Sequence, residues 1–217
     1  MFSGKKILIT AGPTYEPIDP VRFIGNRSTG KMGIAIAERF AEAGAEVTLV
    51  LGPTHLRPKN VAIQVVGVET GAEMFKACIN KYEHSDIVIM SAAVADYKPA
   101  VVANQKIKKS GTSMNLELIK TTDILFELGK QKTKQFLVGF ALETENLVEN
   151  ATQKLKKKNL DLIVANNTNS SGEGFGFDTN KVIMIDRNNK MYNFELKQKD
   201  EVAGDILDVI EKCLEQK

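Results

Sequence analysis

The chain has 217 residues, of which 43% are hydrophobic and 26% are charged, and its formal net charge at pH 7 is +2. This composition is typical of a folded globular protein, and the small net charge gives no reason to expect nucleic acid as a partner. The apolar runs are far shorter than the roughly 20 residues of a membrane-spanning helix, and the N-terminus lacks the apolar region of a signal peptide. We therefore expect no membrane association and a cytoplasmic location.

The first half of the chain alternates between strand and helix patterns. "KKILIT" is a β-rich run that leads into a long turn-forming loop, "AGPTYEPIDP". Ser28 and Thr29 are candidate caps for a helix over "GKMGIAIAERFAEAGA", which we expect to end at Gly44. A strand "EVTLVLGP", a helix "TGAEMFKACINKYE" and a buried strand "DIVIMSAAVA" follow.

The second half continues the alternation with the helix "TDILFELGKQ", the strand "FLVGFAL", the helix "ENLVENATQKLKKKN" and the strand "LDLIVANN". Residues 180–216 are predicted to form a β-hairpin, turned at residues 187–189, and a closing helix. Strands separated by helices of this length predict a Rossmann-like α/β fold with a doubly wound, mainly parallel sheet. We expect one domain over residues 1–217.

Two segments depart from the alternation. Residues 97–119 are extended and carry no helical period, which predicts a flap outside the parallel strand order. The segment "SSGEGFGFD", residues 170–178, is rich in glycine and predicts a mobile loop.

The stretch "GNRSTGKMG" resembles a phosphate-binding loop without completing one. A Walker A motif requires Ser or Thr after the lysine, and here Met32 follows Lys31. A dinucleotide fingerprint requires the glycines directly after the first strand, and a long proline-containing loop intervenes. A Tyr-x-x-x-Lys pair of the kind used in hydride transfer is also missing. What remains is Asn26 and Ser28 before a helix N-terminus, where free backbone N–H groups can hold an anion.

Two lysine clusters have both a structural and a functional interpretation. "KIKK", Lys106 to Lys109, is either an edge strand protected by solvated lysines or part of a site. In "QKLKKKNLD", lysines near a helix C-terminus complement the helix dipole, but Lys154 and Lys158 also share one face. Asp96 follows a buried strand and is either a turn residue or a ligand contact, and Phe140 is either core or a stacking surface.

The sequence gives little support for a disulfide framework, a zinc site or a nucleophilic catalytic triad. Cys78 and Cys213 are the only cysteines and lack CxxC spacing, while His55 and His84 are the only histidines. A disulfide framework and a zinc site are therefore not expected, and the ligands of any metal stay unknown. No Ser/His/Asp or Cys/His arrangement is visible, which favours chemistry in which the protein positions its substrates and neutralises their charge.

Five motifs in chain order resemble the phosphopantothenate–cysteine ligase family, also called phosphopantothenoylcysteine synthetase. They are "TAGPTYEPIDPVRFIGNRSTGKMG", "SAAVADYKP", "KIKK", "GFALET" and "NLDLIVANN", and they cover nearly the whole chain. The resemblance implies an enzyme of coenzyme A biosynthesis that activates 4′-phosphopantothenate with CTP as an acyl-cytidylate. L-cysteine then displaces CMP. Mg²⁺ is expected to accompany CTP.

The resemblance also implies roles for particular residues. Lys106 matches the lysine needed to form the intermediate, and Asn26 matches the asparagine that holds the acyl-cytidylate; Asn26, Ala92 and Ala93 are expected to bind the substrate. The expected nucleotide contacts are Met90, Ser91, Ala92, Asp96, Lys106, Thr122, Asp123, Ile124, Leu125, Phe140, Lys154 and Lys158.

Family members are dimers in which each flap reaches across to the partner, so a homodimer is expected. In many bacteria the ligase is fused to a flavin-dependent decarboxylase, so such a domain or protein is an expected partner. CTP use is implied by the overall similarity to bacterial members of the family, not by any particular residue that would contact the base. The alternative is a non-catalytic nucleotide-binding dimer that acts as a regulator, and the presence of Asn26 and Lys106 argues against it.

Overall fold

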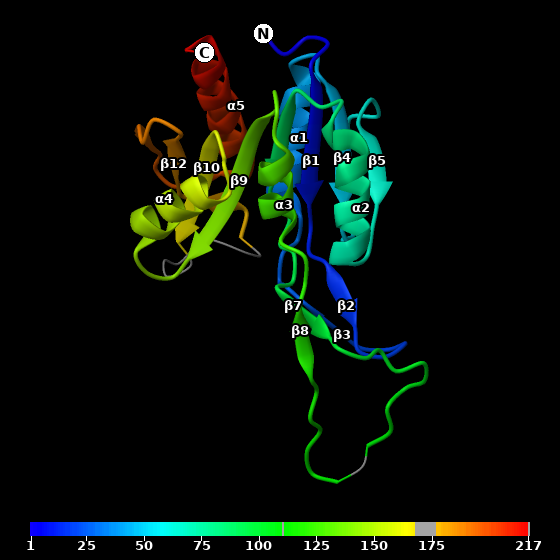
Figure 1. Cartoon of the computed structure of the whole chain (residues 1–217). Coiled ribbons are helices and arrows are strands. Elements are labelled where there is room, and N and C mark those ends of the chain that lie inside the picture. Colours follow the sequence, from blue (N-terminus) through cyan, green and yellow to red (C-terminus); the bar gives the residue numbers. More distant parts are fainter. Residues whose placement is uncertain (110, 168–176, 217) are drawn as a thin grey trace.

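A mixed eight-stranded sheet forms the centre of the molecule (Figure 1). The computed structural model describes residues 1–109, 111–167 and 177–216. The strands lie in the order β13-β12-β10-β9-β6-β1-β4-β5. Their bounds are β1 Lys6–Ala11, β4 Glu46–Leu51, β5 Gln64–Gly67, β6 Ile87–Met90, β9 Phe136–Glu143, β10 Leu162–Asn167, β12 Val182–Asp186 and β13 Met191–Asn193.

The six neighbouring strands β10-β9-β6-β1-β4-β5 are parallel to one another. The hairpin of β12 and β13 extends the sheet beyond β10 in antiparallel fashion. The chain runs from β1 outwards to β4 and β5, then returns to the other side of β1 to form β6, β9 and β10. This confirms the predicted doubly wound sheet and the C-terminal hairpin. The reversal of direction places the topological switch point between β1 and β6.

Helices cover both faces of the sheet (Figure 1). They are α1 Lys31–Glu42, α2 Gly71–Tyr82, α3 Ile124–Gln131, α4 Leu147–Lys157 and α5 Lys199–Glu215. Ile7 and Ile9 of β1 belong to the core that α1 and α5 cover, whereas Leu8 belongs to the core under α2, α3 and α4. Side chains of a strand alternate between faces, so a largely apolar strand such as β1 supplies both cores.

The helix ends agree only in part with the caps predicted from the sequence. Thr70 caps α2 by accepting a hydrogen bond from Glu73 N at 3.2 Å. The expected stop of α1 at Gly44 is confirmed, since Gly44 has φ of 83°. The expected caps of α1 are wrong, because its N-cap is Gly30 in the left-handed region and no side chain caps it.

Three small strand pairs lie outside the main sheet. A hairpin of β2 (Tyr15–Pro17) and β3 (Phe23–Gly25) forms within the predicted long loop, and β11 (Thr179–Asn180) pairs with β14 (Lys197–Gln198). At the base of the flap, β7 (Tyr97–Pro99) pairs with β8 (Leu118–Lys120). Beyond this base the flap projects away from the sheet (Figure 1).

The flap and the segment after β10 differ in how far the structure tests the sequence-based interpretations. The interpretation of "KIKK" as an edge strand is wrong, because residues 106–109 lie in the irregular part of the flap. The predicted mobile loop at residues 170–178 falls mostly outside the described residues. Among the helices that are described, none is long and apolar enough to span a bilayer.

Candidate active site

A cleft of about 650 Å³ opens at the switch point, where the carboxyl ends of β1 and β6 diverge. Ligands of doubly wound sheets bind at such a point, because loop amides and helix N-termini face the opening there. The walls of this switch-point cleft come from the loop after β6, the end of β3, the start of α3, the middle of β9 and one face of α4.

The loop after β6 is held in place by side chains at the end of β1. Ser91 Oγ donates to the Thr10 carbonyl at 2.7 Å, and Ala92 N donates to Thr10 Oγ1 at 3.2 Å. Further along, Ala95 N donates to the buried hydroxyl of Thr14 at 3.0 Å. The loop therefore presents a fixed backbone to the cleft, while the Ser91 hydroxyl is engaged in holding the loop.

Asn26 reaches the cleft from the end of β3. Its Nδ2 donates to the carbonyls of Ala93 and Val94 at 3.0 and 3.1 Å, which leaves Oδ1 available as an acceptor. The close approach depends on Gly25, because a Cβ at that position would lie 2.7 Å from Tyr15 Cδ1. The amide is thus positioned before any ligand arrives.

The start of α3 forms another part of the cleft wall. Asp123 caps this helix by accepting from Phe126 N at 3.1 Å, and Thr122, Ile124 and Leu125 line the wall beside it. A helix N-terminus carries unpaired N–H groups and partial positive charge, so this wall suits an anionic or strongly polarised group.

Two lysines, Lys154 on α4 and Lys158 at its C-cap, line the cleft. Lys154 Nζ lies 2.5 Å from Glu143 Oε1, and Lys158 Nζ lies 2.9 Å from Asp123 Oδ2. The two lysines are one helical turn apart, as their spacing predicted. Each is held near the cleft by a carboxylate at its edge.

A smaller cavity of about 140 Å³, called here the α1 arm, lies on the other side of Ala92 and Phe140. Its walls include the uncapped start of α1 and the side chains of Lys31 and Lys199. Lys199 is only 9% exposed, and burial, followed by the charge of Lys31, lowers the pKa of its amine. A buried amine beside an uncapped helix start is suited to a small, highly charged anion.

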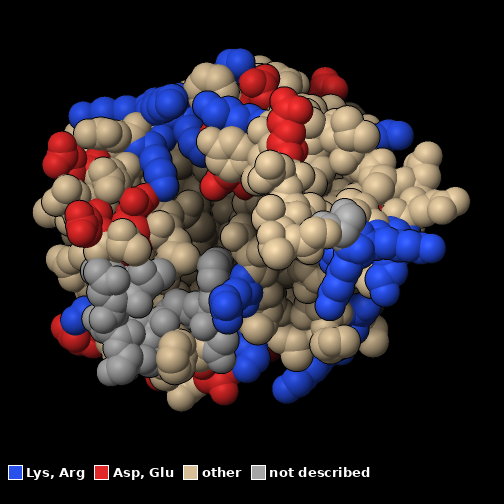
Figure 2. All heavy atoms as spheres, turned by 90° about the horizontal axis from the view of Figure 1, so that it is seen from below, with Lys and Arg blue, Asp and Glu red and all other residues tan. Residues whose placement is uncertain are grey.

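The surface around the cleft is rich in positive charge. Figure 2 views the molecule from the end at which the flap projects, which is the carboxyl edge of the parallel strands. Lys and Arg side chains lie on several sides of the central hollow. Such a surface raises the local concentration of anionic ligands.

The structure gathers most of the predicted site residues in one place. The switch-point cleft is lined by Asn26, Met90, Ala92, Ala93, Asp96, Thr122, Asp123, Ile124, Leu125, Phe140, Lys154 and Lys158. Ser91 lines the α1 arm. Lys106 is exposed on the flap and is not among the residues lining its own chain's cleft.

The position of Lys106 is set by its neighbour. Ile107 N donates to Asp19 Oδ2 at 3.1 Å, and Arg22 Nη2 donates to the Ile107 carbonyl at 3.0 Å. Asp19 is fully buried, and the Arg22 guanidinium holds the pKa of its carboxyl well below the usual range. This clamp ties the flap to the turn of the β2–β3 hairpin.

Some lining residues were missed by sequence reasoning. Thr10 and Lys120 line the cleft, and Lys199 and Asn180 line the α1 arm. Lys199 opens the last helix and has no motif around it, so only the packing of α5 beside α1 brings it to the site. In the part of the chain that is described, no group of three or more Asp, Glu, His or Cys side chains could hold a metal ion.

The mainly parallel α/β sheet, with a lysine-rimmed cleft at its switch point, belongs to the doubly wound class, whose members bind ligands at this edge. The chain belongs to the family described as the DNA/pantothenate metabolism flavoprotein C-terminal domain, whose model matches residues 2–214.

The chain is similar to longer curated proteins. It is 52% identical to a "Cysteine/Cysteine sulfinic acid decarboxylase" of an unknown prokaryotic organism, with 94% of this chain and 57% of that protein covered. It is 48% identical to the "Coenzyme A biosynthesis bifunctional protein CoaBC" of Bacillus subtilis (strain 168), with 95% and 51% covered. The chain thus spans about half the length of the curated relatives it matches.

A solved structure matches over nearly its full length. The crystal structure of the C-terminal domain of the coenzyme A biosynthesis bifunctional protein CoaBC is 46% identical, with a TM-score of 0.85. The match covers 100% of this chain and 98% of that one. The Rossmann-like fold is therefore shared with that domain.

Proposed function

We propose that the chain is a ligase that joins 4′-phosphopantothenate to L-cysteine through an acyl-cytidylate, giving 4′-phosphopantothenoylcysteine, CMP and pyrophosphate. The observation that carries the proposal is that one cleft is lined by Asn26, Lys154 and Lys158. The coenzyme A biosynthesis proteins among the relatives support the same assignment. The decarboxylase name of another relative belongs to a protein of which this chain matches 57%, so it does not assign an activity to the matched part.

In the first step, the carboxylate of 4′-phosphopantothenate attacks the α-phosphorus of CTP. A bond forms between the carboxylate oxygen and the α-phosphorus, and the bond to the bridging oxygen breaks as pyrophosphate leaves. Negative charge develops on the phosphates, so cations are needed there. Lys154 and Lys158 supply them from α4, and the α1 arm, with Lys31 and Lys199, suits the pyrophosphate end.

In the second step, the amine of cysteine attacks the acyl carbon. The carbon–nitrogen bond forms, the bond from the acyl carbon to the phosphate oxygen breaks, CMP leaves, and the amine loses a proton. Asn26 is held with Oδ1 as an acceptor, which suits it to orient the acyl-cytidylate and the incoming amine. Negative charge develops on the carbonyl oxygen in this step and needs a hydrogen-bond donor or a cation beside it.

The nucleotide contacts expected from the family fit this geometry. Phe140 lines both cavities and offers a flat wall to a base, while Asp96 and Thr122 lie on the cleft wall. Mg²⁺ would neutralise charge on the triphosphate. The few carboxylates of the cleft, such as Asp96 and Asp123, fit a cation that takes most of its ligands from phosphate and water.

The flap geometry supports a homodimer. Lys106 lies on a flap that projects away from the sheet (Figure 1), so the same lysine would serve the cleft of a second copy. A decarboxylase, as a fused domain or separate protein, stays a proposed partner, supported by the bifunctional names of longer relatives.

Variants of Lys106 and Asn26 distinguish the proposed ligase from a non-catalytic regulator. We expect Lys106→Gln to abolish pyrophosphate release, while Lys109→Gln on the same flap retains it. We expect Asn26→Asp to accumulate acyl-cytidylate without forming the amide, as detected by quenching and mass spectrometry. Normal turnover in both variants would overturn the assigned roles, and nucleotide binding by a wild-type protein without any turnover would favour the regulator.

A further inference from the structure

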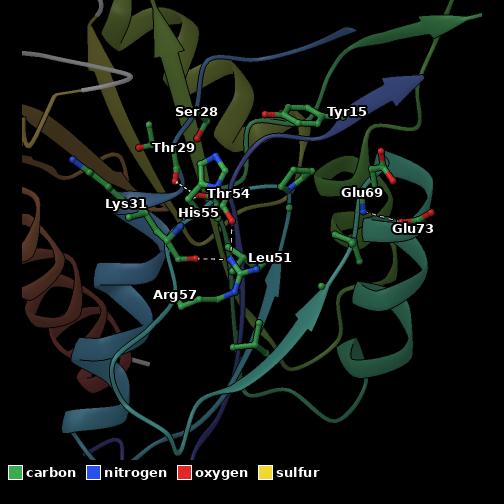
Figure 3. Close-up of a pocket in the computed structure, with 16 residues that line it drawn as sticks. Tyr15, Ser28, Thr29, Lys31, Leu51, Thr54, His55, Arg57, Glu69 and Glu73 are labelled. Carbon is green, nitrogen blue, oxygen red and sulfur yellow. Dashed lines mark hydrogen bonds between the residues drawn. The ribbon is translucent and has the colours of Figure 1, made fainter. Parts of the chain in front are cut away.

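A third cavity, of about 940 Å³, lies at the carboxyl ends of β4 and β5, beside the loop that precedes α1 (Figure 3). We call it the β4–β5 cavity. Ser28, Thr29 and Lys31 lie on one side and Glu69 and Glu73 on the other, with the segment after β4 between them (Figure 3). Among its lining residues, only Lys31 has a role proposed above, and that role lies in the α1 arm.

The walls of the cavity are tied together. Thr54 Oγ1 donates to the Thr29 carbonyl at 2.8 Å, which links the segment after β4 to the loop before α1. On the other side, Tyr15 N donates to the Glu69 carbonyl at 2.8 Å. The Tyr15 ring is stacked on Phe23 with centroids 3.8 Å apart, so its orientation is fixed. The cavity is therefore largely formed before a ligand binds.

The lining combines an apolar surface with cations. Leu56, Val65 and Val68 supply the apolar part, and Val65 is 40% exposed although it is a large aliphatic side chain. Arg57 lines the same cavity, and its Nη1 donates to the carbonyls of Thr54 and Leu56, each at 2.7 Å. Among the described residues its Nε and Nη2 donate to no protein atom, so they are available to a phosphate.

The position of the cavity in the fold indicates the class of ligand. In doubly wound sheets, one nucleoside half of a dinucleotide lies at the ends of the first strand and its neighbour, here β1 and β4. A carboxylate after the neighbouring strand selects an unmodified ribose, whereas an arginine accommodates a ribose phosphate. Residues 51–57, "LGPTHLR", contain no Asp or Glu and end in Arg57.

We propose that the β4–β5 cavity binds a purine nucleotide that carries a phosphate on its ribose as well as at the 5′ position. Arg57 would hold the ribose phosphate, and the apolar side chains would contact the base. Ser28, Thr29 and Lys31 also line the α1 arm, so the occupant contacts the loop that leads to the proposed catalytic cleft. The site is separate from the cytidine nucleotide and goes beyond the proposed ligase reaction.

Calorimetric titration of the full chain with adenosine 3′,5′-bisphosphate, adenosine 2′,5′-bisphosphate and AMP tests this, with excess CTP present to occupy the switch-point cleft. We expect one of the bisphosphates to bind at least about tenfold more tightly than AMP, because a charged hydrogen bond is lost in AMP. Preference for the 3′ isomer would indicate a coenzyme A type of headgroup, and preference for the 2′ isomer an NADP type; either supports the site. Equal affinity for all three, or no binding, would overturn the proposal.

Two variants and a control make the test specific. Arg57→Gln should weaken bisphosphate binding about tenfold or more, while Lys59→Gln, two residues further on and outside the cavity lining, should leave it unchanged. Gly67→Leu should fill the cavity and prevent binding without unfolding the protein, because a Cβ at Gly67 meets no atom within 4 Å. Unchanged binding in Arg57→Gln or in Gly67→Leu would refute the assignment. The titration measures binding directly, so failure of the ligase activity would not affect it.

Discussion

The lysines of α4 allow the proposed nucleotide site to be tested by changing one side chain. Lys158 is 19% exposed and lies 2.9 Å from Asp123 Oδ2 on the cleft wall. Lys158→Gln removes the cation but keeps much of the side chain. A hydrogen bond between charged groups is worth about 1.5–3 kcal/mol, which corresponds to roughly 10- to 150-fold in affinity. The loss also leaves the Asp123 carboxylate facing the triphosphate, so we expect the Kd for CTP to rise by about 10- to 100-fold.

The same helix provides the control. Lys157 is exposed and does not line the cleft, so Lys157→Gln should change the Kd by less than about twofold. CTP binding is measured by calorimetry without 4′-phosphopantothenate, so that no reaction occurs. Stability should hardly change, since an ion pair to a half-exposed Asp123 contributes at most about 1 kcal/mol. Wild-type affinity in Lys158→Gln, or an equal loss in Lys157→Gln, would refute the placement of the triphosphate.

Three further outcomes concern stability and reactivity. Gly33→Ala should lower the free energy of unfolding by about 1–2 kcal/mol in urea titrations, because the new Cβ would lie 2.5 Å from atoms of β1 and of the loop after β6. Gly204→Ala in α5 should instead stabilise the protein, because its new Cβ would meet no atom within 4 Å. Asp19→Asn should destabilise the protein at neutral pH. Arg22 depresses the pKa of Asp19 in the folded protein, so the stabilisation by the ionised carboxylate is lost as that carboxylate is protonated. The difference in unfolding free energy between wild type and variant should therefore shrink below the unfolded carboxyl pKa of about 3.9. Burial raises the pKa of Cys78 to about 12, so this thiol should resist labelling at pH 8 until urea unfolds the protein; rapid labelling of native protein would contradict its burial.

The parallel core was predictable because its signals are local. Strands such as β1 and β6 are largely apolar runs, and Gly44 marks a helix end that the structure shows in the same place. The parallel order follows from the alternation of helices and strands, and it brings the carboxyl ends of strands to one edge. This is why most of the predicted site residues meet in one cleft.

Other features depend on contacts that one stretch of sequence does not reveal. The strand β5 is short and mostly exposed, and only its pairing with β4 defines it. The β2–β3 hairpin lies in a segment whose prolines indicated a loop, and its turn is fixed by the buried carboxylate of Asp19. Lys199 reaches the α1 arm because α5 packs beside α1, more than 150 residues away in the sequence.

Pyrophosphate release from the purified protein is the most direct test of the proposed ligase. With Mg²⁺ and CTP, we expect release only when 4′-phosphopantothenate is present, and we expect CMP and the amide to appear only after cysteine is added. The same assay with ATP shows which nucleotide the cleft accepts. Release that does not depend on 4′-phosphopantothenate, or folded protein that binds CTP yet releases no pyrophosphate with either nucleotide, would contradict the account.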